Sequence, residues 1–180
     1  PQVSIFGAGH VGRALAALMA LLPVRVVVID HAERPGEKIR ISGGGRCNFT
    51  NLGAAPDRYL SANPHFAKSA LGRYRPQDFI ELVDAHGIGW HEKTLGQLFC
   101  DGSARQIVAM LMAECGTGGV AFSFGASVTD VAHLDGLYGV SVGSRALIAP
   151  KLVIATGGPS IPKMGATGFA YDLARQFGLK

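Results

Sequence analysis

The stretch Gly7-Ala8-Gly9-His10-Val11-Gly12 decides the fold, because it stands between a predicted strand and a predicted helix. The apolar run at residues 3–6 predicts the strand, residues 11–22 predict the helix, and the β-branched run at 24–29 predicts a second strand. A glycine turn at this place lets the backbone approach a pyrophosphate, and the first N–H groups of the helix face the phosphates. The unit therefore predicts a dinucleotide site.

The predicted contacts at this site come from the turn and from the end of the second strand. Gly7 allows the tight turn, Gly9 the close approach to a pyrophosphate, and Gly12 the packing of the helix on the sheet. Asp30 is the expected acceptor for the ribose hydroxyls of adenosine. The full set of predicted contacts here is Gly7, Gly9, His10, Val11, Gly12, Asp30 and His31. The alternative is a strand-helix-strand unit that serves only the fold.

A second predicted contact region lies within residues 31–64, which are rich in Gly, Pro, Arg, Asn and Ser. Its centre, residues 42–51, is expected to form neither regular helix nor regular strand. Glycine N–H groups and the donor fork of an arginine suit a flat or anionic ligand, and the cations nearby make the local field positive. These cations are Arg34, Lys38, Arg40 and Arg46. A flexible, solvated basic loop is the alternative.

Further patterns predict helices at residues 76–86, 103–114 and 168–177, and strands within 88–99 and at 152–155. The inward residues of the first two helices are expected to be Phe79, Leu82, Val83, Ile107, Met110 and Leu111. Residues 120–150 predict an antiparallel meander with turns at Asp135-Gly136 and Gly143-Ser144. The fold class is thus α/β, with segments at 1–30, 31–65, 66–119, 120–150 and 151–180.

Composition bounds the function classes. The net charge is +4 and the basic residues form no run, which argues against a nucleic-acid partner. Three cysteines without Cys-x-x-Cys spacing argue against a disulfide scaffold and a zinc site, and favour a reducing cytoplasm. The longest apolar run, residues 14–22, is too short to span a bilayer, so we expect a soluble protein with no membrane partner. The six histidines show no metal-ligand spacing.

Several residues of types that often act in catalysis or ligand binding are expected to be structural here. Cys47 has no second cysteine five positions on, so a packed thiol is favoured over a redox pair, with a flavin-adjacent thiol as the alternative. His91-Glu92 could transfer a proton, but such a pair is more often surface polarity. Trp90 and Phe99 are expected in the core.

The segment from Pro35 through residues 41–51 resembles the BaiN/YhiN-type flavoproteins, also identified as NAD(P)/FAD-dependent oxidoreductases or the aminoacetone-oxidase family. The similarity continues in residues 96–100, 155–160 and 165–168. It implies a FAD-binding fold of the glutathione-reductase type, with hydride accepted by the flavin and passed on, and NAD(P)H as a possible donor. The implied cofactor contacts are Asp30, Lys38, Ser42, Gly43, Gly44, Arg46, Cys47, Asn48, Thr50, Asn51, Val128, Ala155, Thr156, Gly157 and Gly158.

Two departures from that family matter. Residues 1–30 look instead like the Rossmann segment of XdhC-type xanthine dehydrogenase accessory proteins, so the chain could be a composite joined near residues 26–30. The family also continues for about as many residues again, so we expect this chain to be incomplete at its C-terminus, with the isoalloxazine partly uncovered.

Three interpretations stay open. The first is the FAD-binding portion of a flavin-dependent oxidoreductase acting on an unknown small substrate. The second is a non-catalytic NAD or adenine-nucleotide module. The third is an inactive truncated composite. Neither the catalytic acid or base nor the oligomeric state follows from these patterns.

Overall fold

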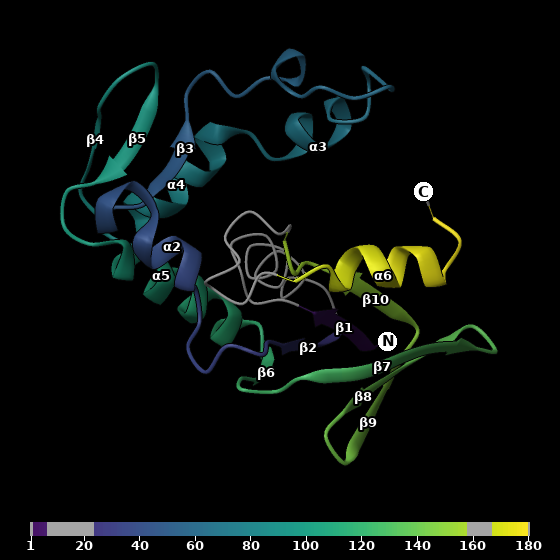
Figure 1. The fold of residues 1–180 in the computed structure, drawn as a ribbon. Helices are drawn as coiled ribbons and strands as arrows, with labels where there is room; N and C mark the ends of the chain where they lie inside the picture. Colours follow the sequence, from purple (N-terminus) through teal and green to yellow (C-terminus); the bar gives the residue numbers. More distant parts are fainter. Residues whose placement is uncertain (1, 7–23, 158–166, 180) are drawn as a thin grey trace. The chain divides into compact units, whose positions relative to one another are not determined.

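The structure is a computed structural model that describes residues 2–6, 24–157 and 167–179. The chain forms two compact units: the first comprises residues 1–38 and 111–180, and the second residues 39–110. Figure 1 traces the elements in chain order. The predicted helix at residues 11–22 lies outside the described residues.

The first unit is built on a parallel sheet with the strand order β10-β1-β2-β6. Its strands are β1 (Gln2–Phe6), β2 (Arg25–Ile29), β6 (Ala121–Ser123) and β10 (Lys151–Ile154). Successive side chains of a strand point to opposite faces. Val26 and Val28 accordingly join a buried cluster with Cys115 and Val120, whereas Ile29 joins a cluster of residues from other elements. Both faces of β2 are thus covered, as a parallel sheet requires.

The second face of β2 meets an antiparallel meander and a helix (Figure 1). The meander consists of β7 (Val128–Leu134), β8 (Leu137–Val142) and β9 (Arg145–Ala149), and the helix is α6 (Phe169–Gln176). Val131, Val140 and Leu173 pack with Ile29. The predicted turn at Asp135-Gly136 is confirmed, with φ of 51° and 77° at the two residues, the combination that a tight hairpin favours.

The second unit holds a small antiparallel sheet of order β3-β5-β4. Its strands are β3 (Asn48–Asn51), β4 (Trp90–Glu92) and β5 (Gln97–Cys100), and its helical elements are η1 (Ser42–Gly45), η2 (Pro56–Arg58), α3 (Lys68–Arg73) and α4 (Pro76–Ala85). Phe49 of β3 packs on Phe79 of α4, with 6.0 Å between the ring centroids. Two helices run across the unit boundary in the chain: α2 (Glu37–Ile41) and α5 (Ala104–Thr117).

The predicted fold class is confirmed, and α2, whose Ile39 is buried, lies in the basic stretch before the glycine loop. Two local predictions are wrong. Residues 48–51 form strand β3, because Phe49 is buried and the segment pairs with β5. In α4, Ile80 is buried where Leu82 was expected, since the buried face runs through Phe79, Ile80 and Val83. Among the described residues, no helix is long and apolar enough to cross a membrane.

Candidate functional site

The carboxyl edge of the parallel sheet in the first unit is the first candidate site. Phe6 lies in register with Ile29 on one side and Ile154 on the other, so the segments that follow β1, β2 and β10 leave the same edge. Because β1 stands between β2 and β10, the strand order reverses at β1, and such a point is where open α/β sheets bind ligands. The predicted contacts Gly7, Gly9, His10, Val11, Gly12 and Gly158 lie outside the described residues.

Asp30 follows β2 at this edge. One carboxylate oxygen accepts a hydrogen bond from the Ala32 N–H at 2.9 Å, and the His31 Nδ1 lies 3.6 Å from the same oxygen. The side chain of Asp30 is 14% exposed and that of His31 is 52% exposed. The Asp30 backbone donates to the Ser123 carbonyl, which fixes the residue against the end of β6. The carboxylate is therefore held in a defined place with access to solvent.

Val128, the predicted neighbour of the adenine, opens β7. The Asp30 carbonyl accepts a hydrogen bond from the Ala126 N–H at 3.0 Å, two residues before Val128. The Val128 side chain is half-buried against the cluster that contains Ile29. The structure therefore brings Val128 close to the end of the strand that carries Asp30.

The turn after β10 contains Ala155, Thr156 and Gly157. Gly157 has a φ of +74°, and the Lys38 Nζ lies 3.4 Å from where a Cβ on Gly157 would stand. A lysine ammonium thus sits beside a bare stretch of backbone. Thr156 and Gly157 also line a hollow of about 590 Å³ together with residues of α6. A cation, an accessible backbone and open volume at the carboxyl edge are what an anionic ligand needs.

The glycine loop of the second unit is a second candidate site, considered by itself. Gly43, Gly44 and Gly45 all have positive φ, at 58°, 66° and 86°. A Cβ on Gly43 would stand 2.5 Å from the Phe99 ring, whereas one on Gly44 would meet nothing within 4 Å. The Ser42 hydroxyl donates to the Ile39 carbonyl at 2.8 Å. The loop is therefore packed on one side and open at Gly44, beside the exposed Arg46.

Cys47 is fully buried at the end of this loop, and so is Cys100. Burial raises the pKa of the Cys47 thiol, partly offset by a hydrogen bond with Ser42, and burial raises the pKa of Cys100 to about 11. A buried protonated thiol is a poor nucleophile. These properties favour the packed-thiol interpretation of Cys47 over a redox role.

The predicted contacts in β3 differ from one another. Asn48 is exposed and Thr50 is half-buried. The Asn51 amide is occupied within the unit, because its nitrogen donates to the Leu95 carbonyl at 3.0 Å and its oxygen accepts from the Gly53 N–H at 2.7 Å. Asn51 thus ties the end of β3 to the β4–β5 turn.

The histidine and tryptophan of β4 are placed by neighbours that sequence spacing did not indicate. His91 Nδ1 lies 2.7 Å from an Asp101 oxygen, not beside Glu92, whose carboxylate accepts from the Gly96 N–H. Trp90 donates from its indole to Asp84 at 2.7 Å and packs edge-on against Phe49. His91 lies on β4 and Asp101 directly follows β5, and the two strands pair antiparallel. Recognising residues 90–100 as a hairpin could therefore have predicted the His91–Asp101 pair.

The predicted contacts therefore fall into two groups. The first unit carries Asp30, His31, Lys38, Val128, Ala155, Thr156 and Gly157; the second unit carries Ser42, Gly43, Gly44, Arg46, Cys47, Asn48, Thr50 and Asn51. In the described ranges, no group of three or more His, Cys, Asp or Glu side chains is arranged to hold a metal ion.

Comparison with known proteins adds the family context. The model of the HI0933-like protein Rossmann domain matches residues 1–180, and so includes the segment that resembles the accessory proteins. The chain is 53% identical over 175 residues to a ribosomal RNA dihydrouridine synthase of Escherichia coli K12, covering 97% of this chain and 44% of that protein. The protein of the same name from Haemophilus influenzae Rd is 48% identical over 179 residues, covering 97% and 45%.

More distant relatives share the fold. A 3-dehydro-bile acid delta(4,6)-reductase of Clostridium scindens is 25% identical over 181 residues, covering 98% of this chain and 44% of that protein. Thermovibrio ammonificans THI4 has a TM-score of 0.58 at 15% identity, covering 99% of this chain and 63% of that one. The halogenase PltM with phloroglucinol and FAD has a TM-score of 0.53 at 18% identity, covering 98% and 36%. The chain spans less than half the length of the curated relatives it matches.

Proposed function

Because the chain belongs to the HI0933-like Rossmann-domain family, we propose that it is the FAD-binding portion of a flavin-dependent oxidoreductase. The observation that carries the proposal is the shared carboxyl edge of β1, β2 and β10, where Asp30 and the Lys38–Gly157 pair stand. A parallel sheet with polar groups at this edge is the usual place for a dinucleotide.

The residues present fit such a group. Asp30 would accept hydrogen bonds from the adenosine ribose, and Lys38 would face the pyrophosphate across the bare backbone of Gly157. In the second unit, the open backbone at Gly44 and the exposed Arg46 are donors of the kind that suits a phosphate or a flavin edge. Bound FAD would supply hydride acceptance and delivery, with NAD(P)H as the proposed donor.

We propose that the substrate of the whole protein is a uridine base in ribosomal RNA. Two relatives with 53% and 48% identity bear the name ribosomal RNA dihydrouridine synthase. The reaction would add one hydride and one proton across the C5–C6 double bond of the uracil ring, leaving dihydrouridine, while NAD(P)H is oxidised to NAD(P)+. This proposal runs against the composition, which argued against a nucleic-acid partner and for a small substrate.

Titration of the purified chain with FAD, NAD and ADP tests the cofactor. We expect FAD to bind with a perturbed visible absorbance and to raise the melting temperature. Tighter binding of NAD or ADP than of FAD would instead support a non-catalytic nucleotide module. Unchanged melting with all three ligands would contradict the proposal.

The substrate is tested on the full-length protein. Ribosomal RNA from cells lacking the gene is incubated with the enzyme, FAD and NADPH, then digested and analysed for dihydrouridine by mass spectrometry. We expect a gain of two mass units at one uridine. NADPH oxidation without any dihydrouridine would overturn the RNA substrate and leave the flavin proposal standing.

A further inference from the structure

One segment of the second unit exposes several large apolar side chains to solvent. Residues 52–77 follow β3 and lead into α4 through η2 and α3 (Figure 1). The exposed apolar side chains in and beside this segment are Leu52, Tyr59, Leu60, Phe66 and Leu95, with exposures from 45% to 97%. Tyr59 lines one hollow together with Leu95 and lies beside Phe66, and neighbouring exposed apolar side chains of this kind mark a binding surface. We call these residues together with Arg58, Lys68 and Arg73 the excursion surface.

Two aromatic rings of the excursion surface lie beside each other. Tyr59 and Phe66 meet edge to face, with 6.4 Å between the ring centroids, and they are 45% and 51% exposed. They come from either side of a loop, yet each keeps about half of its surface open to solvent. Half-open aromatic rings provide faces on which unpaired bases can stack.

This segment has few acidic residues beside its cations, so it carries much of the net positive charge of the chain. Residues 52–77 hold four basic side chains and a single acidic one, so this segment carries +3 of the net charge of +4. Asp57 lies 3.7 Å from Arg58, and Asp78 is paired with Arg75. Within the described ranges, no carboxylate forms an ion pair with Lys68 or Arg73. Although the sequence has no run of basic residues, Lys68 and Arg73 give the segment a local positive charge.

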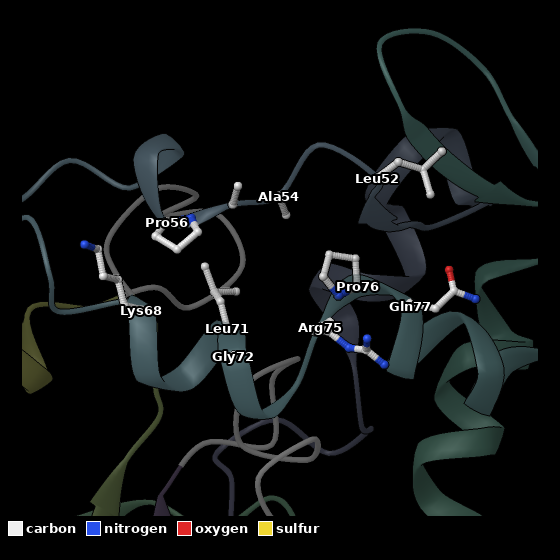
Figure 2. A pocket seen from close by; sticks show the side chains of 10 residues that line it. Leu52, Ala54, Pro56, Lys68, Leu71, Gly72, Arg75, Pro76 and Gln77 are labelled. Carbon is white, nitrogen blue, oxygen red and sulfur yellow. The ribbon is translucent and has the colours of Figure 1, made fainter.

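Two shallow hollows adjoin the excursion surface, and Ala54 lines both of them. The first, of about 400 Å³, is lined by Leu52, Pro56, Lys68, Leu71 and Arg75 among others. Figure 2 shows the Leu71 side chain between Lys68 and Arg75. The second, of about 570 Å³, is lined by Asn51, Arg58, Tyr59 and Leu95. Each hollow therefore combines an apolar floor with at least one cation.

We infer that the excursion surface binds single-stranded RNA, with bases stacked on Tyr59 and Phe66 and phosphates held by Arg58, Lys68 and Arg73. The inference rests on the proposed RNA substrate and names the surface that would recognise it. Aromatic faces interleaved with cations are the combination that single strands require, because base stacking and phosphate neutralisation act together. A second copy of the chain would bring the same positive charge to the same surface, which charge repulsion disfavours.

The test is fluorescence anisotropy of the 180-residue chain with a labelled single-stranded RNA of about 12 uridines and adenosines, a length within the range that such surfaces cover. We expect Tyr59→Ala combined with Phe66→Ala to weaken binding more than tenfold. We expect Lys68→Gln combined with Arg73→Gln to weaken it similarly and to lower the slope of log K against log salt by about 1.4, at about 0.7 per phosphate contact.

Matched controls carry the same changes elsewhere. Arg105→Gln with Arg145→Gln removes two exposed cations, and Leu134→Ala with Ile148→Ala removes two exposed apolar side chains. We expect both pairs to bind the RNA within twofold of the original chain. Equal losses in these controls would overturn the inference, because general charge or general hydrophobicity would then explain binding.

The inference would also be overturned if the single strand did not bind, or if a duplex of the same length bound equally well. It would likewise be overturned if RNA binding were absent and the chain instead formed a concentration-dependent dimer that Tyr59→Ala combined with Phe66→Ala abolishes. FAD titration of the same variants separates this inference from the proposed function. Loss of RNA binding with intact FAD binding supports the surface, whereas FAD binding without any RNA binding overturns the surface alone.

Discussion

The two units hold their candidate contacts in different ways. In the first unit, Asp30 and Gly157 follow the ends of parallel strands, so strand register determines where they stand. In the second unit, the glycine loop depends on local packing: Gly43 against Phe99, and the buried Cys47. The contacts of the first unit should therefore keep their positions after local side-chain changes, as long as the parallel sheet stays folded. The glycine loop of the second unit should shift when even one methyl group is added.

The largest effect should come from the two cores. Ile29 and Leu98 are both fully buried, one in each unit. We expect Ile29→Ala and Leu98→Ala each to lower the free energy of unfolding by about 2–5 kcal/mol, because each leaves a cavity. Hydrogen exchange should show the loss of protection concentrated in the unit that carries the substitution. Equal losses in both units would mean that they unfold as one.

Asp30→Asn is the next largest and tests the first unit. Asparagine keeps an oxygen for the Ala32 N–H, so the turn survives, but the charge that would hold the ribose is lost. We expect FAD affinity to fall by at least tenfold, since hydrogen bonds to charged groups contribute about 1.5–3 kcal/mol. Calorimetric titration measures this, and an unchanged melting temperature without ligand serves as the control. Unaltered affinity would remove Asp30 from the site.

Gly43→Ala compared with Gly44→Ala tests the second unit. Both glycines have positive φ, so each alanine costs about 1–2 kcal/mol of backbone strain. Only the Gly43 side chain would overlap the Phe99 ring, which adds about 1–3 kcal/mol. Thermal unfolding should therefore rank Gly43→Ala below Gly44→Ala in stability. Equal stabilities would show that Phe99 yields and that the loop is less tightly packed than described.

The smallest effect concerns the Cys100 thiol at high pH. Its pKa of about 11 in the folded chain exceeds the ordinary value in an unfolded chain, so the folded state keeps the proton longer. The stabilisation is complete below about pH 8.5 and is lost as the pH rises toward 11. At pH 9.5 the free energy of unfolding has fallen by about 1 kcal/mol for this reason. Cys100→Ala should flatten the decline of unfolding free energy between pH 8 and 10. If the unfolding free energy of the variant declined as steeply as that of the original chain, groups other than Cys100 would cause the decline.

Much of the first unit could be predicted from the sequence. The strands around Phe6, Ile29 and Ile154 are short apolar runs next to glycine or an acid, and the hairpin at Asp135-Gly136 has its own turn signal. These signals are local, so they need no knowledge of distant partners. The glycine motif itself lies outside the described residues and stays a prediction.

The second unit was harder because its structure depends on pairing between distant segments. Residues 48–51 look like loop in isolation, and they become a strand only because β5 lies alongside and Phe49 packs on Phe79. The same holds for His91, whose partner Asp101 is ten residues away. The excursion surface was missed because its cations are separated in the sequence by neutral residues.

Trp90 is the single tryptophan of the chain, and it is anchored in the second unit between Asp84 and Phe49. Its emission is therefore an intrinsic optical probe of that unit alone. The efficiency of energy transfer from Trp90 to a flavin docked on the first unit would measure the separation of the two units in solution. One naturally placed indole thus offers a spectroscopic ruler without any added label.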